Sequence, residues 1–272
     1  MDQLPAVSPN GKEIVFASTR NTDEFPNPQG DNELYVMDIA DDDHDGNGDN
    51  LRRLTDNAVN DAGPAWSPAA KKIAFSSTLD GDSDVYVIDA DGPSQPVNLT
   101  NEASGEPPRF DGQPVYSPDG TRIAFISGRD GNLNVYLTDA EGTAPIRITS
   151  SPATDSQPEF SPDGTRLAFT STRDGDFDLY VLPAATEEAT NLAVNLTDAV
   201  RTESGAVAAD RWPAWSPDGT TIAFSSGTTA LATGDIFTIT TDGAVLTNLT
   251  HTPAPVGDIT PDWGPTPMKR TN

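Results

Sequence analysis

The sequence predicts an all-β fold, a β-propeller of four-stranded antiparallel blades. First, the tetrapeptide SPDG recurs at residues 117–120, 161–164 and 216–219, and each copy opens the same longer phrase. Second, short segments in which apolar and polar residues alternate are separated by clusters of Pro, Gly, Asp and Asn, the pattern of strands joined by tight turns. Third, each repeat is long enough for the four strands of one blade, and no segment of useful length has the period of a helix.

The phrase marks five complete repeats and the opening of a sixth. Copies begin near Ser8, Ser67, Ser117, Ser161 and Ser216. In each copy one strand ends just before the phrase, a second reads IAFSS or similar, a third LYVMD or similar, and a fourth ends in NLT, RLT or RIT. We therefore expect a single domain over residues 1–272, with repeats near 2–60, 61–110, 111–154, 155–209 and 210–257 and a partial repeat at 258–265.

The sixth opening leaves the blade count unsettled. It reads PDWGP, with Trp263 where Trp66 and Trp215 stand in earlier copies. We favour six-bladed ancestry, with three arrangements open. In the first, an N-terminal segment of about one blade precedes the chain in the native protein. In the second, five blades close and PDWGP packs as an extra strand. In the third, a second chain supplies the missing strands. The third arrangement implies self-association through the incomplete blade.

Two further sets of repeated residues are interpreted as structural. Asp-Gly is a hairpin signal, so the segments 80–84, 130–134 and 174–178 are expected to be turns after the second strand of a blade. Two aromatic columns occupy strand positions and are expected to pack the core of the blades. They are Phe16, Phe75, Phe125, Phe169 and Phe224, and Tyr35, Tyr86, Tyr136, Tyr180 and Phe237.

These phrases resemble the PD40, or WD40-like, repeat of TolB-type β-propellers. The matching segments are Pro213–Phe224, Arg129–Leu137 and Arg173–Val181, together with the closing residues Thr55, Thr100, Thr149, Thr197 and Thr250. The resemblance covers nearly the whole chain. It implies a periplasmic or secreted protein, although the chain contains no signal peptide. Propellers of this kind serve as the protein-binding half of TolB, as peptidase-associated domains and as lyases, so the resemblance implies a fold rather than one activity.

The composition excludes several classes of function. A net charge of −26 disfavours nucleic acids and anionic membranes as partners and favours cations or basic partners. Without cysteine, there is no disulfide, thiolate metal site or cysteine nucleophile. Two histidines, His44 and His251, are too few for a multi-histidine metal centre. No apolar run approaches about 18 residues, so no membrane-spanning helix is predicted.

A column of aspartates is the first candidate metal site. One stands three residues before the proline of each opening: Asp2, Asp61, Asp111, Asp155, Asp210 and Asp258. Because this position precedes the innermost strand of a blade, the six carboxylates are expected to ring one mouth of the channel. Neighbours about 8 Å apart at an effective dielectric constant of about 20 repel by about 2 kcal/mol. Such a ring lowers this repulsion by binding Ca²⁺ or Na⁺, by holding protons, or by accepting hydrogen bonds from backbone amides.

An acidic loop is the second candidate. The segment DDDHDGNGDN, residues 41–50, is inserted between the third and fourth strands of the first blade. Its alternating oxygen ligands match the first half of an EF-hand loop and predict Ca²⁺ binding by Asp41, Asp43, Asp45, Asn47 and Asp49. The position of the bidentate glutamate falls on Arg52 or Leu54, and there are no flanking helices. The alternative interpretation is a solvated acidic loop.

The sequence favours a binding protein over an enzyme. There is no G-x-S-x-G nucleophile motif, and neither histidine has a recognisable serine nearby. We therefore predict no catalytic residue and no organic cofactor, with Ca²⁺ as the candidate ion. The expected function is a scaffold that binds a basic or neutral protein or peptide. Two alternatives stay open: a metal-dependent lyase or hydrolase acting on a saccharide or ester at the channel mouth, and a fragment or engineered array without a function of its own.

Overall fold

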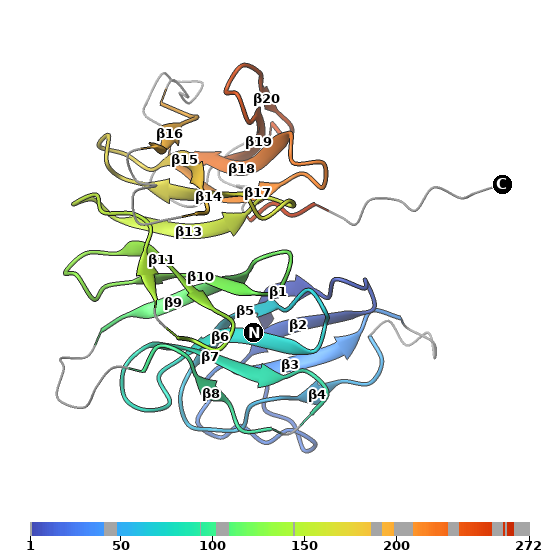
Figure 1. Cartoon of the computed structure of the whole chain (residues 1–272). Helices are drawn as coiled ribbons and strands as arrows, with labels where there is room; N and C mark the ends of the chain where they lie inside the picture. Colours follow the sequence, from blue (N-terminus) through green and yellow to red (C-terminus); the bar gives the residue numbers. More distant parts are fainter. Residues whose placement is uncertain are drawn as a thin grey trace. The chain divides into compact units, whose positions relative to one another are not determined.

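The described chain is built from antiparallel blades (Figure 1). The structure, a computed structural model, describes residues 2–40, 48–92, 94–101, 109–143, 145–185, 192–198, 209–227, 234–251, 258 and 260–263. Within these ranges there is no α-helix, and the strands form four-stranded sheets whose strands follow chain order. Each strand pairs antiparallel with the next. The predicted all-β fold of propeller blades is therefore confirmed.

The blades, numbered in chain order, have these strands. Blade 1 consists of β1 (Asp2–Val7), β2 (Glu13–Ser18), β3 (Glu33–Asp38) and β4 (Arg52–Arg53). Blade 2 consists of β5 (Asp61–Trp66), β6 (Lys72–Ser77), β7 (Asp84–Asp89) and β8 (Val97–Asn98). Blade 3 consists of β9 (Asp111–Tyr116), β10 (Arg122–Ser127), β11 (Asn134–Asp139) and β12 (Ile146–Arg147). Blade 4 consists of β13 (Asp155–Phe160), β14 (Arg166–Ser171), β15 (Asp178–Pro183) and β16 (Val194–Asn195). Blade 5 consists of β17 (Ala209–Trp215), β18 (Thr221–Gly227), β19 (Gly234–Thr240) and β20 (Leu246–Asn248).

The chain divides into two compact units. One comprises Met1–Gly131 and Val135–Ile146, and the other comprises Asn132–Asn134 and Arg147–Asn272. Within the first unit, β1, β2 and β3 contact β5, and β5, β6 and β7 contact β9. Within the second unit, β13, β14 and β15 contact β17. The first strand of a blade thus packs across three strands of the blade before it.

An aromatic pair lies in the core of each blade. The phenylalanine column of the second strands faces the aromatic column of the third strands, with ring centroids 5.6–5.9 Å apart. All members are buried except Phe237, which is partly exposed. Both columns therefore contribute to core packing, as the strand pattern predicted.

The SPDG segments are turns between the first and second strands. The Ser117 hydroxyl donates to the Asp119 carboxylate over 2.6 Å, and the amide of Gly120 donates to the Ser117 carbonyl oxygen over 2.8 Å. Gly120 has φ of +71°, which suits a residue without Cβ. Because the Ser117 and Thr121 donors stabilise its ionised form, the pKa of Asp119 falls to about 2. Ser161 and Ser216 make the same contacts.

Every blade opening carries a left-handed residue two positions after its column aspartate. The residues concerned, Leu4, Gly63, Gln113, Gln157, Trp212 and Thr260, have φ between 51° and 60°. In the five blades this position falls inside a β-bulge of the first strand.

The sixth opening follows the same pattern on blade 5. The Asp258 amide donates to the Gly234 carbonyl oxygen over 2.7 Å, as the Asp61 amide donates to that of Asn32 over 2.8 Å. The indole of Trp263 donates to the Ala214 carbonyl oxygen over 2.9 Å. Asp258 and Trp263 therefore contact blade 5 as the corresponding residues of a first strand contact the preceding blade.

Alanine substitutions at two glycines would test how closely neighbouring blades approach each other. Gly142 has φ of +80°, and a Cβ atom there would lie 2.5 Å from the Leu99 carbonyl oxygen of blade 2. Gly11 has φ of +69° and nothing within 4 Å of such an atom. Gly11→Ala is expected to lower the free energy of unfolding by about 1 kcal/mol. Gly142→Ala is expected to lower it by about 1–3 kcal/mol more, the cost of overpacking. Urea unfolding followed by tryptophan fluorescence measures both, and equal losses would contradict the close approach.

Candidate functional site

One end of each blade collects the polar residues of the repeat. In blade 4, Asp155 at the start of β13 pairs with Ser171 at the end of β14, and Ser171 pairs with Asp178 at the start of β15. The closing Thr197 follows β16 at the same end, because its hydroxyl accepts a hydrogen bond from the Leu179 amide over 2.9 Å. We call this the aspartate end of a blade; the SPDG turns lie at the opposite end.

In blade 2, Thr100 and Asn98 form hydrogen bonds with the acidic turn at residues 80–84. Thr100 accepts from the Val85 amide over 3.0 Å and donates to the Asp84 carboxylate over 2.8 Å. The Asn98 amide group donates to both Asp80 and Asp84, each over 2.8 Å. Oxygens of Asp80, Asp82 and Asp84 lie within 4.8 Å of one another. Burial raises the pKa of Asp84 to about 6, although Asn98 and Thr100 oppose this shift.

Three of the column aspartates pair with an arginine 18 residues later. The distances between carboxylate oxygen and guanidinium nitrogen are 3.0 Å for Asp2 and Arg20, 2.7 Å for Asp111 and Arg129, and 3.1 Å for Asp155 and Arg173. Asp111 and Asp155 are almost fully buried, at 1% and 0% exposed. The guanidinium groups compensate these buried charges.

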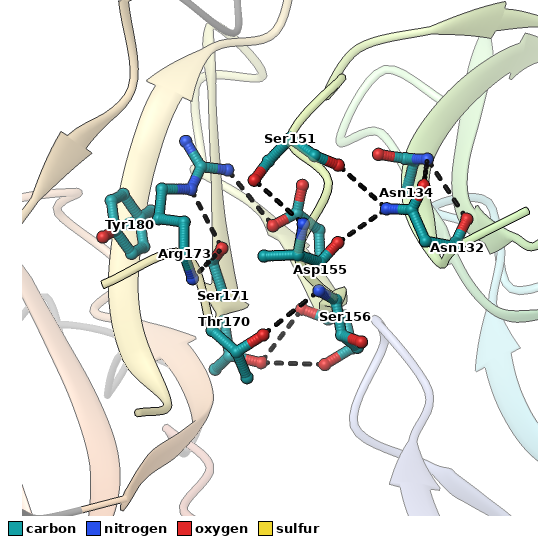
Figure 2. Close-up of polar contacts among 12 residues, drawn as sticks. Asn132, Asn134, Ser151, Asp155, Ser156, Thr170, Ser171, Arg173 and Tyr180 are labelled. Carbon is teal, nitrogen blue, oxygen red and sulfur yellow. Dashed lines mark hydrogen bonds and ion pairs between the residues drawn. The ribbon is translucent and has the colours of Figure 1, made fainter. Parts of the chain in front are cut away.

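Each of these arginines also covers the aromatic pair of its blade. Figure 2 shows Arg173 between Asp155 and Tyr180. Its guanidinium carbon lies 4.4 Å from the centroid of the Tyr180 ring, and its Nε donates to the Ser171 hydroxyl over 2.9 Å. The amide of Asp155 donates to the Leu133 carbonyl oxygen over 2.9 Å. One arginine therefore joins the charge at the blade opening to the aromatic core.

Two column aspartates have no arginine at this spacing. Leu79 stands 18 residues after Asp61, and Thr228 stands 18 residues after Asp210. Asp61 is 0% and Asp210 1% exposed. Burial raises both pKa values, that of Asp210 to about 7, and the nearby carboxylates of Asp178 and Asp176 add to the shift of Asp210. The hydroxyl groups of Ser226 and Thr197 beside Asp210, and those of Ser77 and Thr55 beside Asp61, oppose these shifts.

Two further carboxylates lie beside Asp61. Glu33 is the first residue of β3, and Asp31 precedes it by two residues. The backbone amide of Asn57 donates to Glu33 over 2.7 Å, and its side chain donates to Asp61 over 2.9 Å, so one residue bridges the two carboxylates. Burial raises the pKa of Glu33 to about 7, and the charges of Asp61 and Asp31 add to this shift.

These three residues, which we call the Asp31–Glu33–Asp61 cluster, were not predicted as a group. Only Asp61 belongs to the predicted column. The sequence signal for this difference is Leu79. In blades 1, 3 and 4 the residue 18 positions after the column aspartate is an arginine, whereas in blade 2 it is this leucine.

The other predicted ligands are placed as follows. Asp41, Asp43, Asp45 and Asn47 of the acidic loop lie outside the described residues, so the predicted loop site stays a prediction. Asp49 is described: its amide donates to the Ala40 carbonyl oxygen over 3.0 Å, and its carbonyl oxygen accepts from the Asp38 amide over 2.7 Å. The six column aspartates are shared between two units that are described separately, so a cation ring also stays a prediction.

Comparisons with known proteins agree with this architecture. Residues 97–204 match the family model PD40, described as the TolB beta propeller domain. TolB from Acinetobacter baumannii is similar with a TM-score of 0.72 and 20% identity, covering 98% of this chain and 58% of that chain. A putative TolB from Agrobacterium tumefaciens is similar with a TM-score of 0.68 and 19% identity, covering 91% of this chain and 80% of that chain.

An enzyme contains a similar propeller. A puromycin-hydrolyzing peptidase from Mycobacterium tuberculosis is similar with a TM-score of 0.63 and 18% identity, covering 91% of this chain and 37% of that chain. The chain therefore spans little more than half of the A. baumannii TolB and about a third of the peptidase. No curated protein matches the sequence. The described residues include no helix that is long and apolar enough to cross a membrane.

Neutralising a buried carboxylate that has a cationic partner usually destabilises a protein. For a column aspartate without an arginine partner, such as Asp210, we expect the opposite effect. An acid whose pKa is raised on folding contributes stability that is fully present below its unfolded pKa and is lost as pH rises through the folded value. For Asp210 this window runs from about pH 4 to about pH 7. Asp210→Asn should therefore stabilise the protein by about 2 kcal/mol or more at pH values above this window and change little below it.

The matched variant is Asp155→Asn, which leaves Arg173 without its carboxylate partner. It should destabilise the protein by about 3 kcal/mol on both sides of that window. Urea unfolding of the two variants in the presence of a metal chelator measures both effects. If Asp210→Asn lost as much stability as Asp155→Asn at high pH, the distinction between the two kinds of junction would be wrong.

Proposed function

We propose that the chain is a non-catalytic scaffold of the TolB propeller type that binds a basic protein or peptide segment at the aspartate ends of its blades. The observation that carries this proposal is the placement of charge at these ends. The turns after the second strands present Asp80, Asp130 and Asp174, which are all exposed. The arginines of the same ends, such as Arg129 and Arg173, are turned toward column aspartates and are about 15% exposed.

The exposed carboxylates are held in place by the repeat. The Tyr136 hydroxyl donates to Asp130, and the Tyr180 hydroxyl donates to Asp174. Asp80 accepts hydrogen bonds from Asn98 and Asn101. Because their orientation is fixed before binding, less side-chain entropy is lost when a cationic group arrives. Such an arrangement favours binding over simple solvation of the acidic surface.

A protein or peptide is the ligand class that suits this pattern. Within one unit, Asp80 and Asp130 stand at corresponding positions of consecutive blades. A small cation meets one of these carboxylates, whereas a basic segment meets several at once and gains affinity from multivalency. The net charge of −26 also steers basic partners toward the protein. The likeness to TolB supports a periplasmic or secreted setting for this function.

The proposal predicts salt-sensitive binding of basic peptides. A labelled peptide of alternating lysine and serine should bind, and its affinity should fall about tenfold or more when salt rises from about 50 to about 300 mM. A peptide of alternating glutamate and serine should not bind. The double variant Asp80→Asn with Asp130→Asn should weaken binding of the basic peptide about threefold or more. Fluorescence anisotropy measures these affinities.

The matched control changes the same amount of charge at the opposite ends of the same two blades. Asp91→Asn with Glu141→Gln removes two exposed carboxylates there and should leave the affinity nearly unchanged. Equal weakening by the two double variants would show general charge attraction and overturn the proposed surface. Absence of binding by the basic peptide at low salt would also overturn it.

A further inference from the structure

We propose that Arg211 recognises one carboxylate group of the bound segment, either an acidic side chain or the end of the partner's chain. Arg211 follows the column aspartate Asp210 in β17, at the aspartate end of blade 5. The inference rests on the proposed function, because it names one contact that a basic segment makes at that surface.

The backbone is fixed on both sides of Arg211. The Asp210 amide donates to the Phe177 carbonyl oxygen over 2.7 Å, and the Trp212 amide donates to Oε1 of Gln157 over 3.0 Å. Both contacts join β17 to blade 4, and both blades belong to the same compact unit. The side chain of Arg211 therefore starts from a rigid position at the junction of blades 4 and 5.

An aromatic ring orients the guanidinium group. Its central carbon lies 3.5 Å from the centroid of the Phe177 ring, and both residues are half-buried. A guanidinium group so close to the centroid covers the face of the ring, and this cation–π contact restricts its plane. The N–H donors lie along the edge of that plane, where a planar acceptor can meet them.

No acidic side chain of the described residues neutralises this charge. None of the ion pairs between them includes Arg211, and its Nε is buried without a hydrogen-bond partner. Burial lowers the pKa of Arg211, and no neighbouring carboxylate opposes this shift. Asp210 precedes it in the chain, but successive side chains of a strand point to opposite faces. A partly buried cation thus stands without a counter-charge in a chain of net charge −26.

Other stacked arginines of the same unit have an acceptor within the protein. Arg173 lies over an aromatic ring and pairs with Asp155 at 3.1 Å. Arg166 also lies over an aromatic ring and donates to the Gly219 carbonyl oxygen over 3.0 Å. Arg211 has the ring without the acceptor. The component that is missing is therefore a negatively charged or polar oxygen from outside the described chain.

The pair of Arg211 and Phe177 is particular to this junction. At the earlier junctions the position of the arginine carries a small side chain, and the position of the phenylalanine carries no aromatic ring. These residues are Ala62, Gly112 and Ser156, and Asn32, Ser83 and Leu133. The repeated fold therefore does not require the cation–π pair, which favours a role in binding.

The chemistry of the junction favours a carboxylate. A carboxylate is planar and presents two oxygens, which match the guanidinium fork with two parallel hydrogen bonds. Asp176 and Asp178 flank Phe177 in the sequence, so a phosphate dianion would be repelled more than a carboxylate of single charge. In a basic segment, the neighbouring cations can meet exposed carboxylates such as Asp174. One acidic group among basic residues would thus fix the register of the bound segment.

A set of peptides tests this inference at about 50 mM salt. The parent peptide alternates lysine and serine and ends in an amide. In the other peptides glutamate replaces one serine at a time, or the chain ends in a free carboxylate. Each change removes positive charge, so general attraction to the acidic protein predicts weaker binding. We expect that a carboxylate at one position instead strengthens binding to the wild type about threefold or more, and that Arg211→Gln abolishes this gain. Fluorescence anisotropy measures the affinities, and the position of the gain tells a side-chain carboxylate from a chain end.

Arg166→Gln is the matched control, because it removes a stacked arginine at the opposite end of blade 4, and it should keep the gain. With the parent peptide bound, the inference is overturned if no carboxylate strengthens binding to the wild type or if the gain persists in Arg211→Gln. An equal loss in Arg166→Gln would also overturn it. Circular dichroism establishes that each variant is folded. Arg211→Lys retains the charge without the two-pronged geometry, should lose most of the gain, and decides the outcome if Arg211→Gln does not fold.

A small probe separates this inference from the proposed function. The side-chain N–H signal of Arg211, assigned by its absence in Arg211→Gln, is followed by NMR during titration with N-acetylglycine. It should shift with this carboxylate and not with N-acetylglycinamide, whether or not the parent peptide binds. A shift without binding of the parent peptide would overturn the proposed basic-segment surface and leave the carboxylate site in place. No shift, or a larger response to inorganic phosphate, would overturn the carboxylate site itself.

Discussion

The buried aspartate at the opening of blades 2 to 5 is the constraint on which the rest of the structure depends. Its backbone amide ties the first strand to the carbonyl oxygen that precedes the third strand of the blade before it, at 2.9 Å for Asp155 and Leu133. This contact brings the carboxylate into the blade junction, where water cannot compensate its charge. In blades 3 and 4 the arginine 18 residues later does so and, like Arg20 in blade 1, also lies over the aromatic rings of the core. Strand entry, blade junction and core are thus connected through one ion pair.

Where no arginine follows the column aspartate, that carboxyl group is buried without a guanidinium partner. Burial raises the pKa values of Asp61 and Glu33 at one such junction, and those of Asp210 and the neighbouring Asp178 at the other. A repeat protein tolerates such local differences because each repeat contacts only its neighbours, so one junction can change without repacking the others. The strands have the same arrangement in every blade, whereas the charged residues at the junctions differ. The junctions are therefore chemically distinct sites within one repeated fold.

The sequence predicted the strands well because their signals are local. Alternating apolar residues, the SPDG turns and the aromatic columns each depend on contacts within a blade, and the structure confirms all three. Asp31 and Glu33 were missed because their significance depends on Asp61 in the next blade, and no single segment shows that pairing. The acidic run at 41–50 was predicted as a Ca²⁺ site from its alternating oxygen ligands, a local pattern, and that site stays a prediction. The arginine-to-leucine change at position 79 was readable from the aligned repeats, but its meaning required knowing that the arginines face the column aspartates.

The carboxylates of the described chain lie at two depths, some exposed and some buried, and salt acts differently on the two. Asp80 and Asp130 are exposed, so their attraction for a basic segment is screened beyond about 10 Å at moderate salt. Asp31, Glu33 and Asp61 are almost completely buried, where screening is weak and an uncompensated charge is costly. Salt therefore weakens the surface interaction much more than the buried one.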